Sequence, residues 1–314
     1  MIKHMDGFDQ FEGQTKMADA LSMAGYETSG NVAMVNGRNQ KTRALQFEGT
    51  IKRTFTSSEN KVVFGFAYCA NNDRSTIVTI KDLLTLEWPG AIQIGSVVGD
   101  AKPIIGIWYY YEIVVDKSSK EISVYINNEL DLVASMPDSA TFMRDFEVSF
   151  AAGKSAKQID DLVFIDSADG GAKDRVGPLA IGIRLPRADV VTDFSVPNEN
   201  YHFANVNVLP PVSGAYIKSN VSKATDTFLS SDEIGDGTPV AVGMVVMAKK
   251  SDIDGRQLGM LVGDAKSGKV KEVIDTNLST TDKFSYAVFE TDPDGNAWTS
   301  QTIQSTPFGV RVRP

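Results

Sequence analysis

The sequence contains few of the residues that metal and redox chemistry require. A single cysteine, Cys69, excludes an internal disulfide and any multi-cysteine metal site. The two histidines, His4 and His202, lie in no motif with a nucleophilic serine or cysteine. "GKSAK" at 153–157 does not complete the phosphate-binding pattern of a P-loop. We therefore expect no catalytic residue, no transition-metal site and no nucleotide cofactor.

Long apolar runs and basic clusters are lacking as well. No stretch approaches the roughly 18–20 consecutive apolar residues that a membrane helix needs. The first ten residues, "MIKHMDGFDQ", are polar where a signal peptide would need an apolar core. The formal net charge is -9, and Lys and Arg form no run that could neutralise phosphates. The sequence predicts a chain made in the cytoplasm, without membrane insertion and without a nucleic-acid partner.

Helical periodicity is scarce, whereas alternation of apolar and polar residues recurs from end to end. This alternation is typical of half-buried strands, and one short helix is expected within 15–28. A length of 314 residues with 42% hydrophobic content suggests two domains. Polar residues and prolines without clear periodicity predict an extended linker arm at 181–211. The sequence therefore predicts an all-β chain with domains at 1–180 and 212–314.

An aromatic ribbon, "WYYYEIVVDKSSKEISVYINNELDLV" at 108–133, is the most informative segment. Its alternation predicts a β-hairpin with two aromatic side chains on each face of the first strand. One face must pack against a core, and exposed aromatic side chains tend to mark contacts. We expect the outer face to carry Tyr109 and Tyr111 and to contact either protein or glycan. The candidate contact residues are Trp108, Tyr109, Tyr111 and Tyr125.

Carboxylates supply only weak candidates for catalysis. A retaining glycosidase needs two carboxylates about 5 Å apart. The acid blocks of jelly-roll glucanases are absent, so structural roles are favoured over catalysis. The candidates are Asp160 or Asp161 with Asp166, and Glu112 beside Tyr110.

A loop rich in Asp and Gly, "DSADGGAKD" at 166–174, is the best candidate for a calcium site. Ca²⁺ prefers carboxylate and carbonyl oxygens, which such loops provide. The spacing does not follow the EF-hand pattern, and Asp-Gly turns are common in β proteins. Ca²⁺ therefore stays a weak candidate ligand of Asp166, Asp169 and Asp174.

Several short motifs together resemble a known family. "EISVYINNELDLV" resembles the hairpin of laminin-G-like, concanavalin-type jelly rolls, with Asn128 in place of the usual glycine. "IDDLVFIDSADGG" followed by "GPLAIGIRLP" resembles the end of that domain in many bacteriophage virion proteins. "AYIKSN", "TDTF" at 225–228 and the closing "PFGVRVRP" are similar to the second β domain of the same proteins.

The resemblance implies a laminin-G-like jelly-roll sandwich, an extended linker and a smaller C-terminal β-sandwich. It also implies a non-enzymatic structural component of a phage particle, in the neck, collar, tail or a fibre. Such a protein would be made in the host cytoplasm, located in the virion, and assembled as a homo-oligomer with other virion proteins. The alternative is a receptor-recognition module that binds a host surface glycan, with a glycosidase as the third hypothesis.

Overall fold

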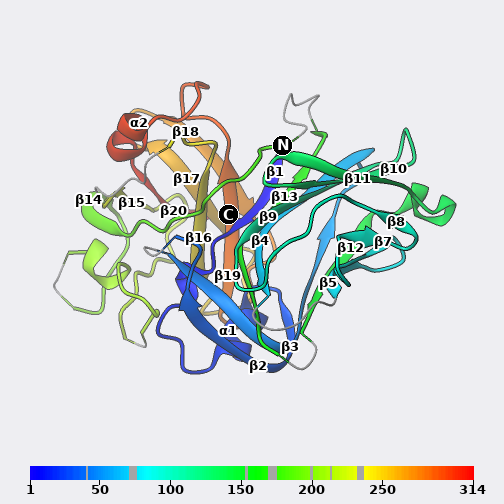
Figure 1. The fold of residues 1–314 in the computed structure, drawn as a ribbon. Coiled ribbons are helices and arrows are strands. Elements are labelled where there is room, and N and C mark those ends of the chain that lie inside the picture. The colour runs from blue at the N-terminus through cyan, green and yellow to red at the C-terminus, as the bar shows by residue number, and fades with distance from the viewer. Residues whose placement is uncertain are drawn as a thin grey trace. The chain divides into compact units, whose positions relative to one another are not determined.

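The structure, a computed structural model, describes residues 1–39, 42–70, 76–152, 155–168, 175–198, 201–212, 214–231 and 237–314 (Figure 1). The chain divides into two compact units, Met1–Gly182 and Ile183–Pro314. Both consist mainly of antiparallel strands, which confirms the all-β prediction. No helix in the described part of the chain is long and apolar enough to cross a membrane.

The first unit is a jelly-roll sandwich of strands with few helices. Its helical elements are η1 (Asp9–Phe11), α1 (Met17–Met23) and η2 (Asp138–Phe142). Its strands are β1 (Ile2–Asp6), β2 (Glu27–Asn36), β3 (Arg43–Thr56), β4 (Lys61–Ala70), β5 (Thr76–Ile80), β6 (Leu84–Glu87), β7 (Gln93–Ile94), β8 (Val97–Val98), β9 (Tyr109–Asp116), β10 (Glu121–Ile126), β11 (Glu129–Ser135), β12 (Asp145–Ala151) and β13 (Lys157–Asp166).

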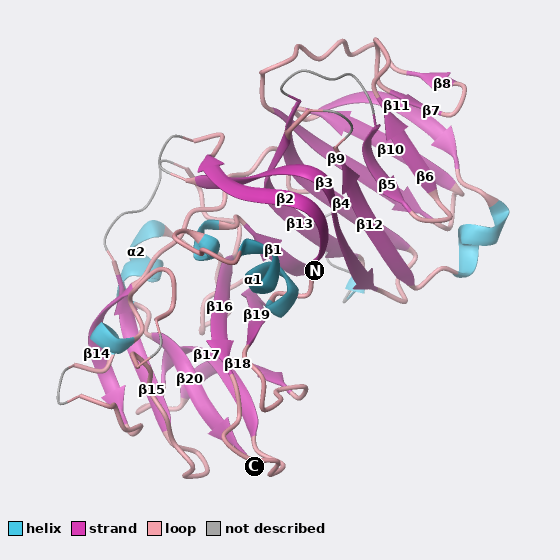
Figure 2. Ribbon diagram, turned by 90° about the horizontal axis from the view of Figure 1, so that it is seen from below, coloured by secondary structure: helices cyan, strands magenta, loops and turns pink. Residues whose placement is uncertain are grey.

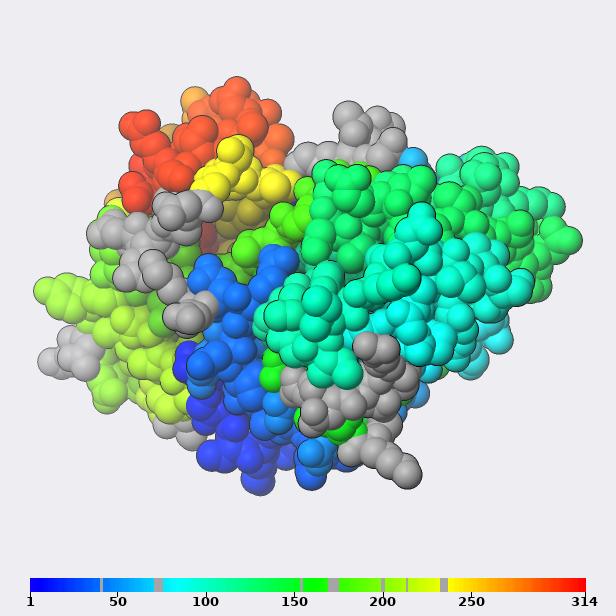
Figure 3. Space-filling model, viewed as in Figure 1, coloured from blue at the N-terminus to red at the C-terminus, as the bar shows by residue number. Residues whose placement is uncertain are grey.

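The long strand β3 joins the two layers of this sandwich. The strands are ordered β11-β10-β9-β4-β13-β3-β12-β5-β6-β7-β8, with β1 beside β13 and β2 beside β3. The first part of β3 pairs with β13, and the part from Thr50 to Thr56 pairs with β12. A strand that passes from one layer to the other is a common corner device in β-sandwiches. The blue, cyan and green atoms of the space-filling view form the surface of this unit (Figure 3).

An aromatic core lies between the layers. Phe64 of β4 lies 5.6 Å from Phe146 of β12, and Phe66 lies 5.0 Å from Phe150, measured between ring centroids. All four rings are buried. Burial of each such side chain contributes about 1.5–3 kcal/mol, so this cluster fixes which face of β4 and its neighbours points inward.

The aromatic ribbon forms the predicted hairpin, and β9, β10 and β11 lie side by side (Figure 2). β9 ends at Asp116 and β10 begins at Glu121. The turn to β11 consists of Asn127 and Asn128, with φ of 49° and 80°. Asparagine tolerates this left-handed region better than most residues, which explains why it can replace the glycine of a tight hairpin turn.

The second unit is a smaller sandwich. It contains β14 (Pro186–Thr192), η4 (Phe203–Asn205), β15 (Thr225–Ser230), β16 (Val242–Ala248), β17 (Gln257–Asp264), β18 (Lys269–Asp275), β19 (Lys283–Phe289), α2 (Ser300–Ser305) and β20 (Phe308–Arg313). A five-stranded sheet, β14-β15-β20-β17-β18, and the pair β16-β19 bury a shared core. Trp298 is part of that core and donates from its indole nitrogen to the Phe289 carbonyl at 2.7 Å.

The segment 181–211 differs from the extended linker predicted for it. Pro186–Thr192 forms β14, an edge strand that pairs with β15, and a short helical turn follows at Phe203–Asn205. The irregular alternation concealed this strand, because β14 is half-buried along most of its length and its register shifts twice. Pro186 is compatible with the first residue of an edge strand, where its missing N–H is tolerated.

Candidate functional site

A shallow groove lies on the outer face of the β9–β10 hairpin, opposite the aromatic core. Glu112 pairs with Tyr125 across the ladder, and Val114 lies two residues further along β9. These side chains therefore share one face, while those of Phe66 and its partner Tyr111 share the other. Because Phe66 and Tyr111 are buried in the core, the face of Tyr125 is the one that points away from it.

Residues 175–178 form the second wall of this groove, and Glu112 fastens them to the sheet. The Glu112 side chain is 1% exposed and accepts a hydrogen bond from Arg175 Nε at 2.9 Å. Its second oxygen accepts from the backbone nitrogens of Val176 at 3.1 Å and Gly177 at 3.0 Å. A buried carboxylate with three donors is well satisfied, so it holds this segment in place instead of facing a ligand.

Arg175 and Tyr125 are stacked on one another. The guanidinium carbon lies 3.5 Å from the centroid of the Tyr125 ring. Arg175 Nη2 also donates to the Asn128 backbone oxygen at 3.4 Å and to the Asn128 side-chain oxygen. A cation–π contact of this kind contributes about 0.5–2 kcal/mol and restricts both side chains. The ring and the guanidinium are therefore preorganised before any ligand arrives.

The groove has a volume of about 620 Å³ and a mixed lining. Aliphatic and aromatic surface alternates with hydrogen-bonding groups from an amide, a guanidinium and an ammonium. Such a combination suits a ligand that has both apolar faces and hydroxyl groups. The lining residues are Lys61, Val114, Tyr125, Asn128, Arg175, Val176, Gly177 and Pro178.

The aromatic candidates from the sequence are distributed differently from the prediction. Only Tyr125 lies in the groove. Tyr111 is 1% exposed and stacks on Phe66 with centroids 5.5 Å apart, and burial raises its pKa well above the ordinary value. Tyr109 is half-buried, and its hydroxyl accepts from Ile104 N at 3.1 Å. The assignment of Tyr111 to an outer, ligand-facing surface was therefore wrong, because the core takes its side chain, whereas a contact at the half-buried Tyr109 stays a prediction. Trp108 is half-buried and does not line the groove.

The carboxylates proposed for glycosidase chemistry are buried structural groups. Asp160 and Asp161 form a bulge in β13, with Asp161 at φ 52°. Asp161 pairs with Arg38 at 2.9 Å and accepts from Ile181 N at 2.7 Å. Burial raises the pKa of Asp160 to about 8 and that of Asp161 to about 6, and Arg38 opposes the shift at Asp161.

Of the three calcium candidates, the structure describes only Asp166. Asp166 is buried and accepts from Ser57 Oγ at 2.9 Å and from Ala168 N at 3.2 Å. Asp169 and Asp174 lie outside the described residues. Within the described ranges, no group of three or more His, Cys, Asp or Glu side chains could hold a metal ion. Ca²⁺ binding stays an untested prediction.

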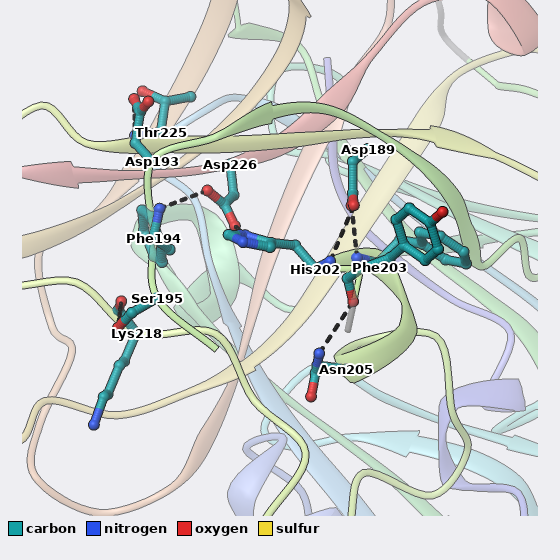
Figure 4. Close-up of polar contacts among 11 residues, drawn as sticks. Asp189, Asp193, Phe194, Ser195, His202, Phe203, Asn205, Lys218, Thr225 and Asp226 are labelled. Carbon is teal, nitrogen blue, oxygen red and sulfur yellow. Dashed lines mark hydrogen bonds and ion pairs between the residues drawn. The ribbon is translucent and has the colours of Figure 1, made fainter. Parts of the chain in front are cut away.

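The second unit contains a histidine–carboxylate pair that the sequence did not reveal. Asp226 of β15 is fully buried and lies 2.7 Å from His202 Nδ1 (Figure 4). The same carboxylate accepts from Phe194 N at 2.8 Å. Burial raises the pKa of Asp226, while the hydrogen bond from His202 acts in the opposite direction.

The side chain of Asp189, in β14, binds the backbone of the same loop. Its carboxylate accepts from His202 N at 3.0 Å and from Phe203 N at 2.7 Å (Figure 4). The two aspartates thus bind the segments 193–195 and 201–205 to β14 and β15. This arrangement supports a loop. Among the described residues, no serine hydroxyl and no cysteine thiol forms a hydrogen bond with the imidazole of His202. A signal was present in "TDTF", where Asp226 lies two residues before Phe228 and so shares its face of a strand, but nothing local named its partner.

Comparison with known proteins identifies no family. No family model matches the chain, and no curated protein matches it. Among solved structures, it is similar to the exoplasmic/lumenal domain of VIP36 in a Ca²⁺- and mannose-bound form, with 10% identity, a TM-score of 0.36, and coverage of 58% of this chain and 99% of that one.

Two further solved structures show similarities of the same order. The carbohydrate-binding module CBM66 from Bacillus subtilis has 12% identity and a TM-score of 0.29, over 45% of this chain and 94% of that one. A sialidase has 10% identity and a TM-score of 0.36, over 46% of this chain but 17% of the sialidase. At such scores and identities these similarities carry no argument about what this chain binds.

Proposed function

We propose that this protein is a non-enzymatic binding module that holds a carbohydrate in the groove of the first unit. The observation that carries the proposal is the stacked pair of Tyr125 and Arg175 beside Asn128. Sugar rings present C–H faces and a rim of hydroxyl groups. Val114 and the Tyr125 ring edge offer apolar contact, and Arg175 and Asn128 offer hydrogen bonds along the same wall.

Preorganisation strengthens this proposal. Binding is weakened when flexible side chains must be ordered, at a cost of about 0.5–1.5 kcal/mol for each long side chain. In the groove, Glu112 and Tyr125 already fix Arg175, and the backbone of Val176 and Gly177 is bonded to the sheet. A shallow, rigid and polar site of this kind suits recognition of one or two sugar units on a longer chain.

The absence of catalysis is part of the same proposal. Glu112 is the carboxylate beneath the groove, and its oxygens are occupied by Arg175 and two backbone donors. A general acid or nucleophile must reach the reacting bond, and glycoside hydrolysis requires a second carboxylate on the other side of it. None of the described lining residues supplies one.

The test is a glycan array probed with the purified 314-residue chain. We expect binding to a restricted set of glycans, and we expect Tyr125→Leu to reduce it at least about tenfold because the stacked wall is lost. Tyr201→Leu is the matched control, since Tyr201 is an exposed tyrosine of the second unit. Circular dichroism would establish that both variants are folded. An array without signal, or equal binding by Tyr125→Leu and the wild type, would contradict the proposal.

A second proposal is that the module belongs to a bacteriophage particle, as the motif resemblance implies. The observation that favours it is the set of exposed apolar side chains between 201 and 221, which an assembly contact would cover. These are Tyr201, Val208, Val212, Tyr216 and Val221. Immunogold electron microscopy of phage-like particles from the source tests it. Label at the neck or tail would support a virion component, and unlabelled particles would count against one.

A further inference from the structure

Asn128 occupies a position where glycine would be the residue of least strain. It is the second residue of the two-residue turn between β10 and β11, and its φ is 80°. Two-residue hairpin turns with positive φ favour Asn-Gly, because glycine adopts positive φ without a steric penalty. Asn128 is exposed, so packing of the core does not require its side chain. Local stability alone therefore does not account for an asparagine at this position.

The side chain of Asn128 contacts the wall of the groove. Its Oδ1 accepts a hydrogen bond from Arg175 Nη2. The backbone oxygen of Asn128 accepts a second hydrogen bond from the same nitrogen at 3.4 Å. The Asn128 Oδ1 also lies 3.4 Å from the point that a Cβ on Gly177 would occupy, so it lies against the backbone of that glycine. The turn between β10 and β11 therefore contacts the wall at two of its residues.

The wall, residues 175–178, depends on such contacts because it forms no helix or strand of its own. Glu112 of β9 holds it through Arg175 Nε and two backbone nitrogens. The stacked ring of Tyr125 fixes the height of the guanidinium plane but not its rotation within that plane. Hydrogen bonds at two different nitrogens, Nε to Glu112 and Nη2 to Asn128, fix the rotation as well.

We infer that Asn128 is a positioning residue of the groove, which holds Arg175 at the angle at which its guanidinium meets a sugar hydroxyl. This inference rests on the proposed glycan-binding function. Asn128 acts through Arg175, so the guanidinium is oriented before the sugar arrives and binding does not bear the cost of ordering it. Removal of the Asn128 side chain therefore weakens binding while the fold keeps its stability.

Two substitutions at this position separate the role of the side chain from that of the turn. Asn128→Gly keeps the positive φ and removes the side-chain acceptor for Arg175, so its thermal unfolding midpoint should stay within about 2 °C of the wild type. Asn128→Asp keeps an acceptor oxygen and tolerates positive φ. Lys120→Gly is the matched control, since Lys120 has a φ of 58° in the turn between β9 and β10 and pairs with Asp138 outside the groove.

The first measurement is ¹⁵N relaxation at the Nε–H group of Arg175 in the ligand-free 314-residue chain. In Asn128→Gly the order parameter should fall below about 0.6, whereas Asn128→Asp and Lys120→Gly should keep the wild-type value. The second measurement is isothermal titration calorimetry with the free oligosaccharide that gives the strongest signal on the glycan array. Asn128→Gly should weaken binding about three- to tenfold, which is the cost of ordering one long side chain. Asn128→Asp should bind within about twofold of the wild type, because it keeps the acceptor.

The outcomes distinguish this inference from the proposed function. An Arg175 order parameter that is the same in Asn128→Gly and the wild type would overturn the inference. Equal weakening of binding by Asn128→Gly and Asn128→Asp would also overturn it, because the amide of Asn128 would then contact the sugar directly. A loosened Arg175 in a chain that binds no glycan would contradict the proposed function and leave the restraint of Arg175 by Asn128 in place.

Discussion

Asp9→Asn should make the first unit more stable at alkaline pH than the wild type. Asp9 is 4% exposed, and one of its oxygens accepts from Arg43 N at 2.7 Å while the other has no partner among the described residues. Burial raises its pKa from 3.8 to about 7, and the charge of Asp161 adds to the shift. Asparagine keeps the acceptor for Arg43 and removes the titrating proton.

The magnitude follows from linkage. Below about pH 3, well under the ordinary pKa of 3.8, the carboxyl is protonated in both the folded and the unfolded states, and it has no effect on the free energy of unfolding. As the pH rises, the unfolded state loses the proton first, so folding stability falls until the folded pKa near 7 is passed. A shift of about 3 pH units at about 1.4 kcal/mol each corresponds to about 4 kcal/mol above that pH, and to about 1.5 kcal/mol at pH 5.

Urea unfolding of the full chain at pH 5 and pH 8.5, followed by tryptophan fluorescence, measures this effect. The stability of Asp9→Asn relative to the wild type should rise by about 2.5 kcal/mol between the two values. Any fixed cost of burying the new amide affects both pH values equally. Asp138→Asn is the control, because Asp138 is exposed and Lys120 lowers its pKa. A constant difference between Asp9→Asn and the wild type would refute the reasoning.

Two further predictions concern the second unit. At Gly259 an added Cβ would lie 1.9 Å from a carboxylate oxygen of Glu272. Gly259→Ala should therefore displace the Glu272 side chain from the two arginines of β20 that bind it. We expect the substitution to lower the free energy of unfolding by about 1–3 kcal/mol, measured by thermal unfolding. Gly255→Ala has open space around it and should be nearly neutral, and equal effects of the two substitutions would contradict the account. Asp226→Asn leaves one acceptor for two donors, so we expect a loss of about 1–3 kcal/mol and faster hydrogen exchange at 201–205. Unchanged exchange there would show that His202 does not hold the loop.

The sequence predicted the hairpin but not which of its faces points outward. Alternation places Tyr109 and Tyr111 opposite Tyr110 and Glu112, and both sets contain two large side chains. Periodicity alone therefore does not distinguish them. The decision comes from β12, whose phenylalanines pack against the face of Tyr111, and that contact joins residues far apart in the chain.

The groove escaped prediction for a related reason. Tyr125 was a candidate, but Arg175 and Glu112 are separated by 63 residues, and no local pattern pairs them. The glutamate looked like a possible catalytic acid because the sequence did not show the three donors that occupy it. In the same way, Asp226 and His202 become partners only when β14 and β15 pair, and β14 itself was hidden in a segment that resembled a linker.

The central claim is that a carbohydrate occupies the groove lined by the stacked side chains of Tyr125 and Arg175. Hydrogen–deuterium exchange of the full chain, with and without a saturating oligosaccharide chosen from the glycan array, tests it most directly. The account predicts slower exchange in peptides covering 122–130 and 175–178, and no change in the second unit. Protection confined to other strands, or no protection despite measured binding, would contradict it.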